Sequence, residues 1–374
     1  MTHRQRALAA MRGQPVDRLP FIARMELWYD FHARAGTLPP RYRGWSLWDI
    51  QRDLDFGIFG RGGTLFKQSF DNVEVREKPH GLETVTEYVT PVGTLSTRHV
   101  WTPELQEAGI RSYRVEHLVK QSSDYDVGTY VVEHTRLTPT FDEFAAFDRK
   151  VGEDGLTLPF IGYCPMHSLM HDYVGYEKFY LDLCDYPAKV ERLHEALLAL
   201  HRQVWRLAAD SPAYAIEYDG NFDEAMTPPP IYEKYFLPTH LECADILHRS
   251  GKLMVAHTDG EMKKLLPLVA QSGYDVAEAF TPKPMTSYTI SDARRAWGDR
   301  VTIWGGIPTV VLTSTFTDAH FEAFMLDLFR QAAPGHRFIL GFGDNVPTDA
   351  VFDRLPTIRH LLARHGRIPI VVRQ

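Results

Sequence analysis

The sequence predicts an α/β fold, a (β/α)8 TIM barrel with a β-rich insertion near the N-terminal third. One observation is a series of short apolar runs that end on polar or glycine residues: 213–218, 252–260, 274–280, 301–307 and 337–343. Another is that helical stretches separate these runs, which favours parallel pairing. Their number suits a closed barrel better than an open sheet. We therefore expect their polar ends to meet at one rim.

The N-terminal part begins with an amphipathic helix over 2–12, stopped by Gly13 and Pro15, and a buried strand over 19–23. Residues 68–135 then differ from the rest of the chain. They are rich in threonine and valine and contain turn residues, which is typical of hairpins or a meander. Strands are expected at 83–90, 93–101 and 130–134. No long Gly/Ser- or Pro-rich linker borders this segment, so it should pack over or beside the barrel mouth.

From about residue 157 onward, strands and helices alternate. The region starts with an apolar stretch at 156–162, and its helices are expected at 187–209, 231–249, 261–272, 289–297, 317–332 and 349–364. Neither a G-x-G-x-x-G after the first strand nor a Walker loop is present, which disfavours a nucleotide-binding fold. The cluster Gly60-Arg61-Gly62-Gly63 is interpreted as a turn. Residues 1–374 are predicted to form a single domain, because barrels with insertions reach this length.

Composition excludes several classes of function. The 374 residues carry a net charge of −7 and no basic stripe, which argues against a nucleic-acid partner. No apolar run approaches the length of a membrane span, and the N-terminus lacks the apolar core of a signal peptide. Cys164, Cys184 and Cys243 form no C-x-x-C pair, which fits a reducing compartment. We expect a soluble, cytoplasmic protein that acts on a small molecule, and an oligomer is compatible with the sequence.

The candidate site residues lie where the strands end. His257 and Asp259, two residues apart, would point the same way and reach one ion. Alternatively, Asp259 caps a helix that starts at Glu261, and His257 is a hydrogen-bonded core residue. Glu278 lies in an apolar strand, where a buried carboxylate needs a partner or a raised pKa. It is a candidate acid, base or ligand, or else half of a structural salt bridge.

Further candidates lie at the end of the apolar run 213–218, which precedes the strand of His257, and in the segment 167–171. Glu217 and Asp219 flank Tyr218, so one is expected to face the barrel interior and the other to bond a loop. His167 and His171 would share a helix face as a metal pair. No glutamate follows them as in a zincin, so a structural function is the main alternative.

Several segments together resemble the uroporphyrinogen decarboxylase superfamily, which also contains corrinoid- and thiol-directed methyltransferases. They are RQRALAAMRGQPVDRLPF at the N-terminus, PPPIYEKYFLPTHLECADILHRSGKLMVAHTDG, and the later GGIP and GDNVP. The resemblance covers most of 1–25 and 157–365 but not 68–135. It implies a (β/α)8 barrel with its site at the carboxyl ends of the strands.

The departures from this resemblance concern the metal and the substrate. Methyltransferases of the family hold zinc with a histidine, a cysteine two residues later and a distant second cysteine. Here these positions are His257, Asp259 and Asp344. Carboxylates favour harder ions, so the resemblance implies a divalent metal, zinc or a harder transition metal. FIARMELWYD keeps Arg24 but lacks the rest of the arginine motif of true decarboxylases, which disfavours uroporphyrinogen as substrate.

The lead hypothesis is an enzyme of methyltransferase type. It would transfer a methyl or other one-carbon group with His257, Asp259, Asp344 and Glu278. No D-x-H-x-x-G motif occurs, so any corrinoid would come from a partner protein. The alternative is a metal-independent decarboxylase or lyase of a small or aromatic acid. There Arg24 would orient the carboxylate, and Asp259 or Glu278 would protonate the carbanion. A binding protein on a decayed barrel is a third hypothesis, disfavoured by the ionisable rim.

Overall fold

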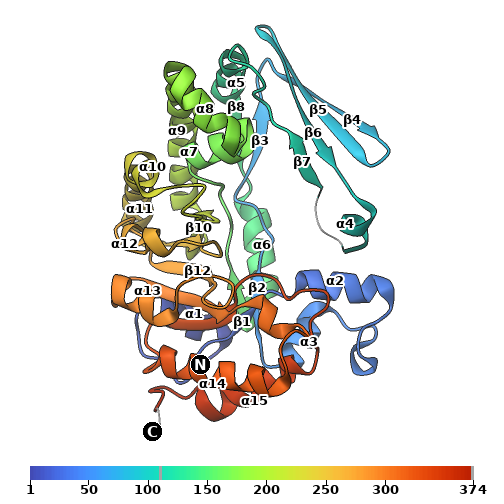
Figure 1. The fold of residues 1–374 in the computed structure, drawn as a ribbon, viewed down its shortest axis with the longest axis vertical. Helices are drawn as coiled ribbons and strands as arrows, with labels where there is room; N and C mark the ends of the chain where they lie inside the picture. Colours follow the sequence, from blue (N-terminus) through green and yellow to red (C-terminus); the bar gives the residue numbers. More distant parts are fainter. Residues whose placement is uncertain (109–111, 372–374) are drawn as a thin grey trace.

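The computed structural model describes residues 1–108 and 112–371, and its core consists of two parallel sheets (Figure 1). Five strands form the larger sheet in the order β10-β11-β12-β13-β14, and three form the smaller sheet in the order β1-β2-β9. Their bounds are β1 Ile22–Ala23, β2 Gly57–Gly60, β9 Gly155–Thr157, β10 Ala215–Gly220, β11 Leu253–His257, β12 Val276–Phe280, β13 Thr302–Ile307 and β14 Phe338–Phe342. The α/β class with parallel strands is confirmed.

The two parallel sheets are joined at both edges by single parallel bridges. Phe160 pairs with Glu217 at one junction, and Phe21 pairs with Leu340 at the other. At the first junction, the Glu217 amide donates a hydrogen bond to the Pro159 carbonyl at 3.0 Å. At the second, the Leu340 amide donates to the Pro20 carbonyl at 2.8 Å. The strands therefore follow one another in the order β1, β2, β9 and β10 to β14, with a contact between the last and the first.

One hydrophobic cluster receives side chains from all eight parallel strands. These residues are Ile22, Phe59, Leu156, Ala215, Val255, Val276, Trp304 and Ile339, all at most 2% exposed. Ala7, Ala10 and Met11 of helix α1 (His3–Met11) join the same cluster. Strands buried on both sides are apolar along their whole length, which is why these strands were recognisable in the sequence.

Helices separate the parallel strands, as the sequence predicts. Those that follow β9 are α7 Pro165–Ser168, α8 Tyr176–Asp185, α9 Pro187–Asp210, α10 Pro229–Ile231, α11 Leu237–Arg249, α12 Leu266–Val269, α13 Ile290–Trp297, α14 Asp318–Ala332 and α15 Arg354–His365. The π-helical turns η3 Leu169–Val174 and η4 Tyr232–Phe236 continue α7 and α10. Two predictions were too long: the helix expected at 261–272 is reduced to η5 Lys263–Leu265 and α12, and that at 349–364 begins only at Arg354.

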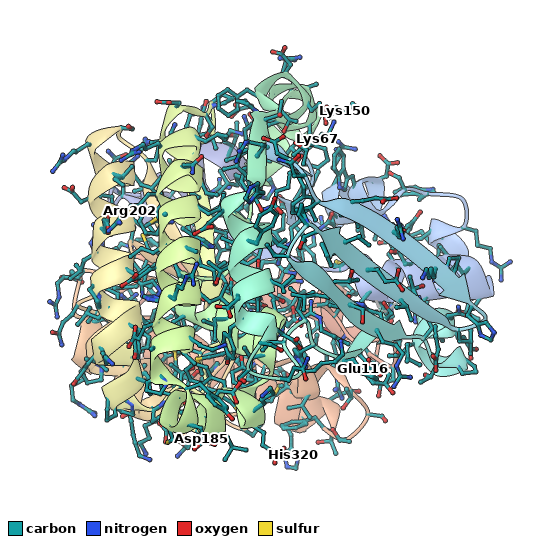
Figure 2. All side chains as sticks on the ribbon, turned by 90° about the horizontal axis from the view of Figure 1, so that it is seen from above. Lys67, Glu116, Lys150, Asp185, Arg202 and His320 are labelled. Carbon is teal, nitrogen blue, oxygen red and sulfur yellow. The ribbon has the colours of Figure 1, made fainter. Side chains whose placement is uncertain are left out.

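Antiparallel strands occupy the chain between β2 and β9. β3 (Phe66–Phe70) pairs with β8 (Thr135–Pro139), and a separate sheet has the order β4-β5-β6-β7. Its strands are β4 Glu74–His80, β5 Glu83–Thr90, β6 Gly93–Val100 and β7 Tyr113–Glu116, which agree with the strands predicted at 83–90 and 93–101. Seen from above, this sheet, with Glu116 at one end, lies beside the helices that carry Asp185 and Arg202 (Figure 2).

The prediction of a strand at 130–134 was wrong. These residues close helix α5 (Asp124–Glu133), which packs along α9. Its buried side chains include Val127, Val131 and Val132, with the spacing of a helix face. The valines suggested a strand, but packing against a long neighbouring helix overrides that local preference. The remaining helices of this part are α2 Glu26–Ala35, α3 Leu47–Asp53, α4 Pro103–Ala108 and α6 Phe141–Val151. No helix in the described residues is long and apolar enough to cross a bilayer.

Candidate active site

A cavity of about 460 Å3 opens at the carboxyl ends of the parallel strands. Its lining comes from residues that end or directly follow β1, β2, β9, β10, β11 and β14: Arg24, Arg61, Gly62, Gly63, Thr64, Leu158, Pro159, Phe160, Tyr163, Glu217, Asp219, Asn221, His257, Asp259 and Asp344. Six of the predicted site residues therefore line one cavity. Glu278, the seventh, lies behind His257 and is hydrogen-bonded to it.

His257, the last residue of β11, is at the centre of a group of carboxylates. Its Nδ1 lies 2.6 Å from Oε2 of Glu278 and 3.6 Å from Oε1 of Glu217, while its Nε2 lies 3.5 Å from Oδ2 of Asp259. Burial disfavours the imidazolium, but the charge of Glu278 and the contact with Asp259 outweigh it and raise the pKa of His257 to about 10. The imidazole is therefore cationic at neutral pH.

The two buried glutamates around His257 have pKa values that are shifted in opposite directions. Burial raises the pKa of Glu217, and Arg61, 3.3 Å from its Oε2, only partly offsets this. Burial also opposes ionisation of Glu278, but the adjacent His257 cation lowers its pKa below the usual value. Glu217 Oε1 is buried and finds no hydrogen-bond partner within the described part of the chain. The site thus holds an imidazolium–carboxylate pair beside a carboxyl group whose pKa is raised by burial.

Glu217, His257 and Glu278 also form a plausible metal-ligand set. Each offers one ligand atom, and these atoms all lie within 4.8 Å of one another. The unpartnered Oε1 of Glu217 would gain a partner from a bound cation, so the residues fit a divalent ion. One imidazole and two carboxylates suit zinc or a harder transition metal. The metal set predicted from the sequence, His257, Asp259 and Asp344, shares only the histidine with this cluster and stays a prediction.

Asp344 forms an ion pair with Arg24 and is not part of the Glu217, His257 and Glu278 cluster. The guanidinium NH1 of Arg24 lies 2.5 Å from Oδ1 of Asp344. Burial works against the Arg24 cation, but Asp344 and Glu278 outweigh it and raise the pKa of Arg24. Asp259 does not begin a helix, because the next helical turn starts only at Lys263 after Met262. The side chain of Asp259 therefore does not cap a helix, and it faces His257.

Asp219 belongs to a second buried cluster. Its Oδ1 accepts a hydrogen bond from Nδ1 of His167 at 2.6 Å, and its Oδ2 accepts one from Nε2 of His240 at 2.7 Å. Although burial alone would raise it, these two imidazoles hold the pKa of Asp219 well below its usual range. The Nε2 of His167 contacts the Tyr176 hydroxyl at 3.0 Å.

His167 and His171, which the sequence suggested as a metal pair, have ring centroids 6.2 Å apart but contact different carboxylates. His171 is exposed and contacts Asp172, with its Nδ1 2.9 Å from Oδ1. His167 is buried and points to Asp219. Cys164 and His240 also offer ligand atoms near Asp219. Burial and the neighbouring Asp219 raise the pKa of the Cys164 thiol well above its usual value, so it favours the neutral form.

Sequence reasoning missed two residues of the site. Arg61 was interpreted as part of a turn, yet it directly follows β2 and pairs with Glu217. The apolar run before it, FGIF at 56–59, followed by polar and glycine residues, is the same signal that identified the later strands. His240 gave no such signal, because a buried histidine on a helix is not distinguishable by pattern from a core residue.

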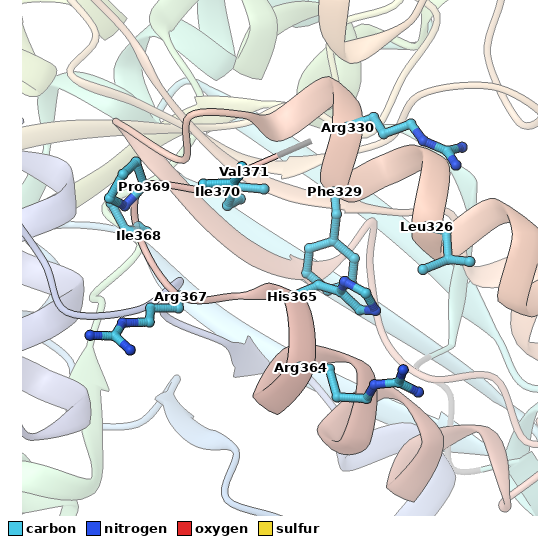
Figure 3. Close-up of a pocket in the computed structure, with 10 residues that line it drawn as sticks. All are labelled: Leu326, Phe329, Arg330, Arg364, His365, Arg367, Ile368, Pro369, Ile370 and Val371. Atoms are coloured by element: carbon cyan, nitrogen blue, oxygen red, sulfur yellow. The ribbon is translucent and has the colours of Figure 1, made fainter. Parts of the chain in front are cut away.

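A larger cavity of about 740 Å3 lies elsewhere, between α14, α15 and the segment that follows α15 (Figure 3). Its described lining residues include arginines and apolar side chains but no carboxylate. The bridge between Arg18 and Arg367 places this segment next to the amino end of β1. It therefore lies at the opposite ends of the strands from the His257 cluster.

The fold and the cavity define an α/β protein whose candidate site lies at the carboxyl ends of parallel strands. The family model described as "Uroporphyrinogen decarboxylase (URO-D)" matches residues 130–362, more than half of the chain. The chain belongs to the uroporphyrinogen decarboxylase family, as its sequence resemblance implied.

Among solved structures, a methyltransferase from Methanosarcina mazei is similar, with a TM-score of 0.58 and 12% sequence identity. The match covers 97% of this chain and 99% of that chain. At this identity the likeness concerns the fold, which extends over the whole molecule. A search of curated proteins finds no match.

Proposed function

We propose that the chain is a transferase that moves a methyl or other one-carbon group in the cavity beside His257. The single observation that carries this proposal is the buried cluster itself. A cationic His257 is held by Glu278, and Glu217 beside it has an unpartnered carboxyl oxygen. Such perturbed groups in a cavity are typical of active sites. The structural likeness to a methyltransferase supports the same reaction class.

The proposal includes a closed (β/α)8 barrel as a single domain. Support comes from the two bridges between the parallel sheets and from the cluster to which every parallel strand contributes. In a closed barrel the strand ends form one rim, so residues from β1 and β14 can face residues from β10 and β11. The candidate residues have this distribution.

The charges in the cavity favour transfer over decarboxylation of a polyacid. Glu217, Asp219, Asp259 and Asp344 line it together with the cations Arg24, Arg61 and His257, and His257 is already paired with Glu278. Both arginines already have carboxylate partners. A substrate with several carboxylates would leave the cavity with excess negative charge and little compensation. An uncharged methyl donor would add no negative charge to the cavity.

The chemistry we propose is cleavage of a carbon–oxygen bond in a methyl ether. The methyl carbon forms a new bond to a nucleophile supplied by a separate corrinoid protein, and its bond to the ether oxygen breaks. The leaving oxygen keeps the bonding electron pair and takes the proton that Glu217 holds. A divalent metal on Glu217, His257 and Glu278, when bound, would polarise that oxygen instead.

The test has two measurements on the purified full-length protein. Metal content is determined before and after chelation, and methyl transfer from methyl ethers is followed with a reduced corrinoid as acceptor. We expect the native protein to transfer the methyl group, and we expect the substitution His257→Ala to abolish this transfer. If metal is bound, we expect it to be easily lost to chelators and to exchange with manganese, iron or cobalt, because the ligands are not thiolates. No transfer to any corrinoid acceptor would contradict the proposal.

The second candidate is a decarboxylase, which one observation favours. Glu217 favours its protonated form and lies 3.3 Å from Arg61, so an acid and a carboxylate-binding cation are adjacent. Release of carbon dioxide from small aromatic acids by metal-free protein would favour this candidate. Loss of that activity in both Arg61→Gln and Glu217→Gln would assign it to this pair.

A further inference from the structure

A third cavity, of about 520 Å3, lies between the β4–β7 sheet and helix α9. One part of its wall is a single face of the sheet, because strand residues two apart point the same way. These residues are Val75, Glu77, Thr86, Tyr88, Thr97 and His99. Another part comes from Leu197, Leu200 and Val204 of α9. Figure 2 shows the sheet to one side of the long helices. We name this space the insertion cavity.

Aromatic rings are the main feature of the insertion cavity. Phe70, Tyr88, Phe160, Tyr163 and Tyr173 line it. Phe70 and Tyr88 meet edge to face with centroids 6.0 Å apart, and Phe160 and Tyr163 do so at 5.5 Å. Phe160 is 43% exposed, unusual for a large apolar side chain beside a buried site. Rings arranged edge to face present further faces and edges to another planar ring.

The charges of the insertion cavity disfavour an anion. Arg114 NH1 is paired with Asp172 at 3.1 Å, which leaves Glu77 as the remaining charged group. The two histidines in the lining are neutral at pH 7: burial and Arg114 lower the pKa of His99, and burial lowers that of His201 to about 4. Arg114 Nε is buried and has no hydrogen-bond partner among the residues that the structure describes. The cavity therefore suits an uncharged molecule that carries an oxygen acceptor.

The insertion cavity adjoins the site of His257. Phe160 and Tyr163 line both spaces. Burial raises the pKa of Tyr163 to about 12, with further contributions from Asp172 on one side and from Asp219 and Asp259 on the other. The tyrosine thus lies between the two sets of carboxylates. A group attached to a ring in the insertion cavity would be presented to the His257 cluster.

We propose that the insertion cavity binds the uncharged aromatic ring of the substrate, which would then be an aryl methyl ether. This inference rests on the proposed function and names its substrate class. The ring packs among Tyr88, Tyr173 and Phe160, and the ether group passes Tyr163 toward His257. The antiparallel segment thereby forms the substrate-binding part of the molecule, and the parallel strands supply the reacting groups.

The test measures binding directly, by ligand-observed NMR titration of the full-length protein with methoxybenzene. Cyclohexyl methyl ether is the matched non-aromatic probe, and 4-methoxybenzoate is the matched anion. We expect methoxybenzene to bind at least about tenfold more tightly than either, because ring contacts and charge both contribute. Equal binding of all three probes would overturn the proposal.

A substitution that fills the insertion cavity tests whether the ring binds there. Thr86→Trp places a large side chain in the cavity and should reduce methoxybenzene binding by at least about tenfold. Val85→Trp, on the opposite face of the same strand, adds a similar volume and should leave binding unchanged. Circular dichroism shows that both variants are folded. Loss of binding in Val85→Trp alone, or unchanged binding in both, would overturn the assignment.

The outcome of these binding tests can be distinguished from the outcome of the methyl-transfer test of the proposed function. His257→Ala should abolish methyl transfer while methoxybenzene still binds, because the ring site lies in a different cavity. Binding without transfer in the native protein would refute the proposed function but support the ring site. Transfer from methoxybenzene that Thr86→Trp leaves unchanged would refute the ring site but support the proposed function.

Discussion

Glu217 and Asp219 lie two residues apart on strand β10, both fully buried, and yet their pKa values are shifted in opposite directions. Asp219 faces two imidazoles within hydrogen-bond distance, and these lower its pKa. Glu217 has Arg61 at 3.3 Å and His257 at 3.6 Å, and its Oε1 has no hydrogen-bond partner among the described residues, so burial dominates and raises its pKa. The comparison shows that burial alone does not decide the charge of a carboxyl group. The number of donors aimed at it does.

The largest expected effect is on activity. His257→Ala removes the cation that holds Glu278 ionised and should lower kcat/KM by about 10²- to 10⁴-fold. It should also abolish metal binding if a metal is present. His320→Ala, in the exposed part of α14, is the control and should change neither. Steady-state kinetics and metal analysis check both variants. Full activity in His257→Ala would show that this cluster is not the reacting one.

The next effect concerns stability and compares the two carboxyl groups directly. Asp219→Asn replaces a carboxylate that accepts from two buried imidazoles, so it should lower the free energy of unfolding by about 2–4 kcal/mol. Glu217→Gln replaces a group whose pKa is raised by burial and should change the free energy of unfolding by less than about 1 kcal/mol. Chemical denaturation at neutral pH measures both. Equal losses would mean that the two sites do not differ as described.

The pH dependence of stability gives a finer test with opposite signs. The pKa of Asp219 is lowered in the folded state, so it stabilises the fold above its usual value of 3.8, and this contribution is lost as the pH falls through the folded pKa. The pKa of Glu217 is raised, so stability falls as the pH rises above 4.5 toward its folded pKa. Glu217→Gln should flatten the profile above pH 4.5, and Asp219→Asn below pH 3.8. Denaturation series at several pH values show whether each slope changes.

The smallest expected effect is on metal content in cysteine variants. Cys164→Ser should leave it unchanged, because the Cys164 thiol favours the neutral form and both oxygens of Asp219 already accept hydrogen bonds. Cys184→Ser and Cys243→Ser should do the same, since neither belongs to a cluster with ligand geometry in the described residues. Loss of metal with Cys164→Ser would move the metal site from the His257 cluster to the Asp219 cluster.

Much of the architecture was predictable from the sequence because the parallel strands are buried on both sides. Such strands are continuously apolar, and β10 to β14 were each recognised with their polar ends. The position of Glu217, His257 and Asp259 near the carboxyl ends of the strands was therefore predictable, because parallel strands align these ends. The strand expected at 130–134 was instead part of helix α5. Its valines are compatible with either state, and contact with α9 decided between them.

The partners of the candidate residues were not predictable. Sequence alone could place Asp344 and Asp259 near His257, but only the tertiary structure paired Asp344 with Arg24 and turned Glu217 and Glu278 toward His257. It also brought Arg61 and His240 to the two carboxyl groups of β10. The sequence by itself determined the fold class, the family and the strand ends at which chemistry can occur, since these depend on local patterns of polarity. The tertiary structure decided the charge of each group, because a pKa depends on neighbours that are distant in the chain.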